Sequence, residues 1–316
     1  MSQLQKNLAF VFPGQGSQSV GMLTQLASSY PEVKQTFEKA SFVLKRDLWA
    51  LVTNGPEDEL NQTQNTQPVM LAAGVAVWEV WCKHSKIRPA WMAGHSLGEY
   101  TALVCSGALF FEDAVKLVDT RARLMQEAVP EGMGAMAAIL GLDDQTVINI
   151  CASIAGQEVV SAVNFNSPGQ VVIAGHSAAV GRAMNALKEE GAKRALLLPV
   201  SVPSHCALME SAADNLEGFL NETVLAHPKL QLVHNVDVKT HAAPEIIRNA
   251  LKEQLYKPVR WVESIELMHQ NGVTNFVECG PGKVLTGLDK RIVKESNHWA
   301  IYDPGTLDYV LEQLND

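Results

Sequence analysis

The sequence predicts an α/β fold, in which a large domain built on a parallel sheet contains a smaller inserted domain. Two observations predict the large domain: a short apolar strand at residues 7–12 and another at 89–93 each lead through a glycine-containing turn into a helical pattern. A third observation predicts the insertion. After Pro130-Glu131-Gly132 the pattern changes to shorter elements in the order β-α-β-β-α-β.

Composition narrows the class of protein. The chain has 316 residues, 47% apolar and 19% charged, which is typical of a globular protein with a large core. The net charge of −9 argues against nucleic acid as a partner, since phosphate binding needs a basic face. The longest apolar stretch, residues 69–82, contains Glu79 and is too short to span a bilayer, so we expect no membrane partner.

Cysteine and histidine usage indicates the compartment and the absence of a metal. The five cysteines are dispersed without C-x-x-C spacing, and the nine histidines form no H-E-x-x-H motif. The N-terminus lacks the pattern of a signal peptide. We therefore expect a cytoplasmic protein with no disulfide framework, no metal site and no bound cofactor.

The first strand, residues 7–12, ends in Pro13-Gly14-Gln15-Gly16-Ser17-Gln18. Glycines on both sides of Gln15 allow backbone N–H groups to point at a ligand, although such a stretch can also be a plain turn. The lysine of a phosphate-binding loop is absent.

Helical patterns follow this loop. One spans residues 20–45, interrupted at Tyr30-Pro31, and another begins at Pro56. The helix at 67–84 is apolar nearly all round, so we expect it to be buried against the sheet.

The turn after the second strand reads Gly94-His95-Ser96-Leu97-Gly98. A G-x-S-x-G sequence between a strand and a helix, here residues 99–106, is typical of the nucleophile elbow of an α/β-hydrolase-like domain. The glycines leave room for the sharp turn, and Ser96 Oγ would lie at a helix start, where negative charge is favoured. The alternative is a turn whose serine only caps the helix.

The insertion is predicted at residues 133–199, within a large domain of residues 1–132 and 200–316. Its strands fall at 133–141, 159–165, 170–174 and 195–199, and its helices at 143–155 and 177–190. This order is that of a ferredoxin-like unit, with a cleft expected between the two domains. Gly175-His176-Ser177 lacks a closing glycine, so Ser177 is expected to be a helix N-cap.

The remaining elements contain residues with no assigned role at this point. Helix 112–128 carries Arg121 and Arg123, and arginines on such helices are most often solvated. His205 is expected near the start of a helix ending at about 225, where it could be a capping or core residue. The other expected elements are strands at 230–235 and 275–278 and helices at 244–255, 262–270 and 307–314.

Four separated stretches of the sequence together resemble one enzyme family. These stretches are residues 12–18, 94–100, 202–209 and 278–282. In this order they are similar to malonyl-CoA:acyl carrier protein transacylases of type II fatty acid synthesis, and the similarity runs nearly end to end. The resemblance implies ping-pong transfer of a malonyl group through a malonyl-serine ester. It also implies two partners, malonyl-CoA as substrate and phosphopantetheinylated acyl carrier protein as acceptor.

The resemblance also implies residue roles. Ser96 corresponds to the nucleophile, His205 to its base, and Arg121 to the arginine that binds the malonyl carboxylate. Gln15 and Leu97 correspond to the backbone N–H donors of the oxyanion hole, and Gln15 also lies beside the substrate. Gln254 corresponds to the residue whose main-chain carbonyl orients the histidine. Residues implied to line the cleft are Asn164, Asn166 and Met125.

These roles agree with the chemistry of the residue types. A serine hydroxyl needs an adjacent base near neutral pH, and two prepositioned N–H groups stabilise the oxyanion formed from a thioester. A guanidinium binds a free carboxylate through two parallel hydrogen bonds. Because acyl carrier protein is acidic, docking would need a local basic surface, and the candidates are Lys193, Arg194, Lys290 and Arg291.

Three other functions remain open from the sequence. A serine thioesterase or hydrolase would use the same elbow, but it predicts an acidic third triad residue and needs no arginine for a carboxylate. An acyltransferase acting in trans on a polyketide synthase would share the chemistry. A non-catalytic partner of acyl carrier protein is disfavoured by the joint presence of Ser96, His205, Arg121 and Gln15.

Overall fold

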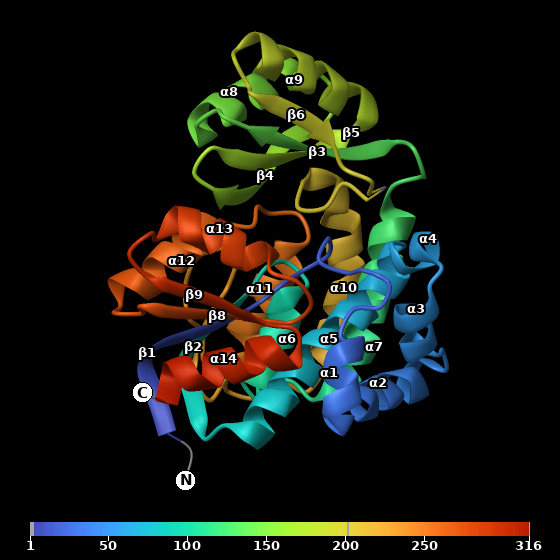
Figure 1. Ribbon diagram of the computed structural model, residues 1–316. Helices are drawn as coiled ribbons and strands as arrows, with labels where there is room; N and C mark the ends of the chain where they lie inside the picture. The colour runs from blue at the N-terminus through green and yellow to red at the C-terminus, as the bar shows by residue number, and fades with distance from the viewer. Residues whose placement is uncertain (1–2, 201, 316) are drawn as a thin grey trace.

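The computed structural model describes residues 3–200 and 202–315. Met1, Ser2, Ser201 and Asp316 lie outside this description, so the two outermost ends of the large domain, which is expected at residues 1–132 and 200–316, are not described. The described chain forms two sheets, one in each half of the molecule, with the smaller sheet and its two helices at the top of Figure 1.

The larger sheet has five parallel strands in the order β7-β2-β1-β8-β9. Their bounds are Gln231–Val233 (β7), Ile87–Gly94 (β2), Gln3–Phe12 (β1), Asn275–Cys279 (β8) and Asn297–Ile301 (β9). The parallel core predicted from the sequence is therefore confirmed. Strand β9 was not predicted from the sequence, because it lies at the sheet edge and reads Asn-His-Trp-Ala-Ile, without a continuous apolar run.

Helices cover both faces of this sheet, and the alternation of side chains along β1 shows why. Leu8, Phe10 and Phe12 face one core, while Ala9 and Val11 face the other. The first core contains α5 (Thr63–His84), whose Trp78 and Trp81 rings pack on Phe10 at 5.5 and 5.2 Å between centroids. The expected burial of this apolar helix against the sheet is confirmed, although it begins at Thr63 rather than at residue 67.

The other helices of the larger half follow the predicted pattern with shifted ends, except the helix at Leu48–Asn54, which was not predicted. The N-terminal part contains α1 (Thr24–Ser29), α2 (Pro31–Leu44), α3 (Leu48–Asn54), α4 (Glu57–Leu60), α6 (Gly98–Cys105) and α7 (Phe111–Ala128). The C-terminal part contains α10 (Glu210–Glu222), α11 (Pro244–Gln254), α12 (Trp261–Gln270), α13 (Val284–Ile292) and α14 (Pro304–Asn315). The break at Tyr30 follows from Pro31, which occupies the first position of α2.

The smaller sheet is antiparallel, in the order β4-β5-β3-β6. Its elements are β3 (Gly134–Leu140), α8 (Asp144–Ala155), β4 (Val160–Ser167), β5 (Gln170–His176), α9 (Ser177–Glu189) and β6 (Arg194–Leu197). The predicted β-α-β-β-α-β order is thus present, with its own apolar core. The exact domain boundaries at residues 133 and 199 stay a prediction.

The expectation that Ser177 caps a helix is wrong. His176 is the N-cap residue of α9, and Ser177 Oγ donates to the carbonyl of Gly132 at 2.8 Å and does not cap the helix. His205 lies near a helix start, as expected: it precedes a 3-10 turn at Ala207–Met209, and its φ of +66° is outside the helical range.

Among the described helices, none is both long and apolar enough to cross a membrane. The five cysteines are free thiols, three of them buried.

Candidate active site

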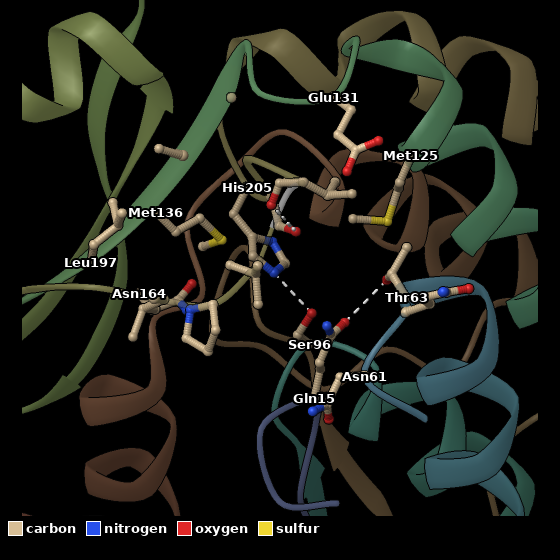
Figure 2. Close-up of a pocket in the computed structure, with 18 of the residues that line it drawn as sticks. Gln15, Asn61, Thr63, Ser96, Met125, Glu131, Met136, Asn164, Leu197 and His205 are labelled. Carbon is tan, nitrogen blue, oxygen red and sulfur yellow. Dashed lines mark hydrogen bonds between the residues drawn. The ribbon is translucent and has the colours of Figure 1, made fainter. Parts of the chain in front are cut away.

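The candidate site lies at the carboxyl edge of the parallel sheet. Phe12 at the end of β1 pairs with Gly94 at the end of β2, so the loops carrying Gln15 and Ser96 leave the sheet side by side. The carboxyl edge of the strands is where α/β sheets commonly bind ligands. A cavity of about 900 Å³ opens here, lined by both halves of the molecule, with Ser96 and His205 facing Met136 and Asn164 (Figure 2).

The turn around Ser96 has the geometry of a nucleophile elbow. Ser96 has a φ of +52°, which is strained for a residue with a side chain, and its N–H donates to Asn235 Oδ1 at 2.8 Å. A Cβ atom on Gly98 would lie 2.0 Å from the Phe12 carbonyl oxygen, and one on Gly94 would lie 1.9 Å from the Gly98 backbone. Only glycines permit this close approach.

Ser96 and His205 have the geometry of a nucleophile and its base. Ser96 Oγ lies 2.8 Å from His205 Nε2, and His205 Nδ1 lies 2.6 Å from the main-chain oxygen of Gln254 (Figure 2 shows the first of these contacts). Because a carbonyl only accepts, Nδ1 carries the proton and Nε2 is free to accept one from Ser96. Burial, with a further contribution from the Arg121 charge, lowers the pKa of His205 to about 3, so the imidazole is neutral at neutral pH.

Arg121 is a buried cation beside the nucleophile, with an exposed fraction of 1%. It donates to Gln67 Oε1 at 2.7 Å and to Gln254 Oε1 at 3.1 Å, and its Nη2 lies 3.4 Å from Ser96 Oγ. Within residues 3–200 and 202–315 no carboxylate pairs with it, and its Nε has no partner. Arg121 is therefore not solvated as most arginines on such helices are, and its expected role in binding the malonyl carboxylate stays a prediction.

The two expected oxyanion donors lie on the loops that meet at the sheet edge. Among the hydrogen bonds of the described chain, neither the Gln15 N–H nor the Leu97 N–H donates to a protein acceptor. The Gln15 side chain is held by Thr63 Oγ1, which donates to its Oε1 at 3.1 Å (Figure 2). Free N–H groups are what the role requires, and the role itself stays a prediction.

Of the three residues expected to line the cleft, two line the cavity and one does not. Asn164 and Met125 line the cavity, and Asn164 Oδ1 is buried without a partner among the described residues. Asn166 does not line it: its Oδ1 lies 2.8 Å from His95 Nε2, and its exposed fraction is 8%. The register of β4 shifts on both sides of these two residues, which breaks the usual rule that residues two apart share a face.

Several residues that organise the site were missed by the sequence analysis. Gln67 orients Arg121, Asn235 holds the Ser96 N–H, and Glu99 and His234 form a buried pair beneath the elbow. Gln67 gives no signal of its own, because it lies in the polar first turns of α5 beside Gln64 and Asn65. The signal for Glu99 was a charge directly after the elbow, which does not distinguish a site residue from a capping residue without the fold.

The expected basic docking residues Lys193, Arg194, Lys290 and Arg291 are all exposed. Their role in docking stays a prediction. No group of three His, Cys, Asp or Glu side chains suited to a metal ion occurs in the part of the chain that the structure describes.

Comparison with known proteins agrees with this geometry. The model of the acyl transferase domain family matches residues 9–302. The malonyl CoA-acyl carrier protein transacylase of Escherichia coli K12 is 57% identical over 304 residues, covering 96% of this chain and 98% of the relative, and that of Bacillus subtilis is 42% identical over 310 residues, covering 98% of each.

Solved structures give the same picture. An acyl carrier protein S-malonyltransferase from Vibrio cholerae superimposes with a TM-score of 0.94 at 57% identity, covering 96% of this chain and 99% of the other. A malonyl-transacylase solved in complex with a type II polyketide synthase acyl-carrier protein has a TM-score of 0.96 at 55% identity, covering 97% and 99%.

Proposed function

The chain belongs to the acyl transferase domain family, and from this membership we propose that it moves the malonyl group of malonyl-CoA to the phosphopantetheine thiol of acyl carrier protein. Relatives that match nearly end to end are named for this reaction. The product would supply fatty acid biosynthesis.

One observation carries the proposal: the same cavity holds a serine–histidine pair and, 3.4 Å from the serine oxygen, a guanidinium with no carboxylate partner in the described chain. The pair serves acyl transfer of any kind. The guanidinium adds a preference for an acyl group that carries its own carboxylate, as malonyl does.

The first half-reaction loads the enzyme. Ser96 Oγ attacks the thioester carbon while its proton passes to His205 Nε2, and the oxyanion accepts hydrogen bonds from the Gln15 and Leu97 N–H groups. The C–S bond then breaks, His205 returns the proton to the departing CoA sulfur, and a malonyl ester remains on Ser96. The neutral state of His205 provides the base for the first transfer.

The second half-reaction unloads it. The phosphopantetheine thiol gives its proton to His205 and its sulfur attacks the ester carbon, after which the proton passes to Ser96 Oγ as the C–O bond breaks. Every proton and bond in the cycle is accounted for by protein groups and the two thiols. We therefore propose malonyl-CoA as substrate and no bound cofactor, in a cytoplasmic setting to which the free cysteines are suited.

A hydrolase is less well supported, because the partner of His205 Nδ1 is a main-chain carbonyl and not the acidic side chain which that alternative predicts. Transfer to a polyketide synthase carrier protein is a second candidate. It rests on the similarity to a malonyl-transacylase solved with such a carrier, and it uses the same chemistry with a different acceptor.

The test is the mass of the intact protein after brief mixing with malonyl-CoA and again after adding phosphopantetheinylated acyl carrier protein. We expect a malonyl adduct that is discharged onto the carrier protein, and no adduct on a folded Ser96→Ala variant. Loss of the adduct as free malonate before carrier protein is added would indicate a hydrolase instead. An adduct on the Ser96→Ala variant would exclude Ser96 as the nucleophile.

A further inference from the structure

Glu99 is a buried carboxylate that the reaction steps above do not use. It lies in the first turn of α6, directly behind the elbow, and its exposed fraction is 0%. A buried carboxylate is costly unless hydrogen bonds satisfy both of its oxygens. What satisfies Glu99 therefore bears on its role.

Three donors converge on this carboxylate. His234 Nδ1 lies 2.7 Å from Oε1, and Oε2 accepts from the Asn235 N–H at 3.1 Å and from Gln254 Nε2 at 2.8 Å. Asn235 in turn holds the Ser96 N–H and the Gly94 carbonyl. Through these contacts the carboxylate is joined to the elbow and to α11.

Gln254 connects Glu99 to the reacting groups. Its Nε2 donates to Glu99 and, at 3.0 Å, to the Ser96 carbonyl, so its Oε1 must face the other way, where it accepts from Arg121. Its main-chain oxygen holds His205. A primary amide has one donor end and one acceptor end, and an acceptor-only carboxylate on one side determines which end faces the guanidinium.

We propose that Glu99 is a positioning residue which, by fixing the orientation of the Gln254 side chain, holds the Arg121 guanidinium in register with Ser96 for an acyl group bearing a carboxylate. The inference rests on the proposed malonyl transfer and adds the residue that sets its selectivity. Glu99 does not touch the reacting atoms. Its hydrogen bond to Gln254 orients the amide, and its charge in addition favours the Arg121 cation. Removing it leaves the Ser96 carbonyl as the remaining one of the two acceptors of Gln254 Nε2, so the amide rotates more freely and can present its NH₂ group to the cation.

The test measures the ratio of single-turnover acylation rates with malonyl-CoA and acetyl-CoA. A residue with only a structural role would not change this ratio. We expect Glu99→Ala to lower this ratio about tenfold or more, the size of a lost hydrogen bond to a charged group. Glu99→Gln can still accept from Gln254 with its amide oxygen, and we expect its ratio to stay within about threefold of the wild type.

A double variant tests whether the effect of Glu99 is transmitted through Gln254. Gln254→Met removes the amide but keeps the main-chain carbonyl, so it should lower the ratio about as much as Glu99→Ala, and adding Glu99→Ala to it should lower the ratio no further than about twofold. If circular dichroism shows that Glu99→Ala is unfolded, Glu99→Asp replaces it, because the shorter side chain withdraws the carboxylate from Gln254.

Glu278→Ala is the matched control. Glu278 is another buried carboxylate, 1% exposed, that accepts from the Leu285 and Thr286 N–H groups and makes no contact with the cavity residues named above. Its loss should lower stability and leave the ratio unchanged. An unchanged ratio in folded Glu99→Ala, or a further loss in the double variant, would overturn the proposed role of Glu99 and leave the proposed function intact. A wild type that takes no malonyl group would overturn the proposed function and this inference together.

Discussion

At the scale of single residues, the chemistry depends on a cation that is oriented without being neutralised. Arg121 is held by two neutral amide oxygens, those of Gln67 and Gln254, and lies over the Tyr100 ring at 5.5 Å. Neutral acceptors fix the guanidinium plane and leave its charge available. A carboxylate in their place would compete with the substrate for the same donors.

The corresponding prediction concerns Arg121→Ala. We expect malonyl transfer to fall about 10- to 100-fold more than acetyl transfer, since the lost contacts are hydrogen bonds to a charged group. The measurement is kcat/KM with malonyl-CoA and acetyl-CoA at fixed carrier protein.

Arg123→Ala is the control for that experiment. Arg123 lies two residues along the same helix, is exposed, and pairs with Glu127 at 3.2 Å, so both activities should match the wild type. Equal losses with the two donors in Arg121→Ala would contradict a role in carboxylate binding.

Individual residue roles were only partly predictable from the sequence. Ser96 and its glycines stand out because the elbow is a contiguous motif. His205 and Arg121 gain meaning only when they lie beside Ser96, and the pattern of an amphipathic helix describes Arg121 equally well as solvated. Gln67 gave no distinguishing signal, because its role depends on which way one amide faces.

At the scale of elements, the elbow fits because β2, α6 and the end of β1 approach within van der Waals contact. The Gly98 Cα faces the Phe12 carbonyl, and that carbonyl accepts from the His95 N–H at 3.0 Å. The strand-to-helix turn is therefore part of the sheet edge. Displacing the strand end would move both the nucleophile and the loop that carries Gln15.

Gly98→Ala should therefore destabilise the protein by about 3 kcal/mol, because a Cβ atom 2.0 Å from a backbone oxygen forces the backbone itself to move. The yield of malonyl adduct on Ser96 should fall together with the stability.

Gly218→Ala is the control. Gly218 is exposed within α10 with no atom near its Cβ position, so alanine there should stabilise the protein by about 0.5–1 kcal/mol. Chemical denaturation measures both, and equal stabilities for the two variants would argue against a tight elbow.

Elements with a strong apolar signal were predictable, and those at edges were not. Strand β1 and helix α5 are apolar and fully buried for much of their length, so their patterns determine them. Strand β9 is an edge strand with polar residues, and its pairing with β8 is formed by residues 22 positions away in sequence. Local pattern carries no information about such a partner.

At the scale of the whole molecule, backbone hydrogen bonds join the smaller half to the larger half beside the cavity. Phe165 of β4 donates its N–H to the Val259 carbonyl at 3.0 Å, and the Val259 N–H donates to Val163 at 2.8 Å. These bonds bring Asn164 of the smaller half to the cavity that holds Ser96. The sequence predicted a cleft between two domains, but which of Asn164 and Asn166 faces it depends on this junction.

The pH dependence of global stability reports the same burial. The unfolded chain protonates His205 near its ordinary pKa of 6.5, whereas in the folded protein burial and the Arg121 charge lower that pKa to about 3. Between these values the unfolded state binds more protons, so stability is complete above about pH 6.5 and falls as the pH is lowered toward 3. Burial lowers the pKa of His95 as well, which adds a loss of the same sign.

We therefore expect the free energy of unfolding of the wild type to fall, between pH 7 and pH 5, by about 2 kcal/mol more than that of a His205→Gln variant. The difference isolates His205, because Glu278 and Asp289, whose pKa values burial raises, contribute to both proteins. Denaturant titrations at the two pH values measure it. Acylation of Ser96 in the wild type should also stay constant down to pH 5, since the base remains neutral. An equal pH dependence in both proteins, together with an acid limb near pH 6.5, would mean that His205 is solvated and that the cavity does not exclude water from its base.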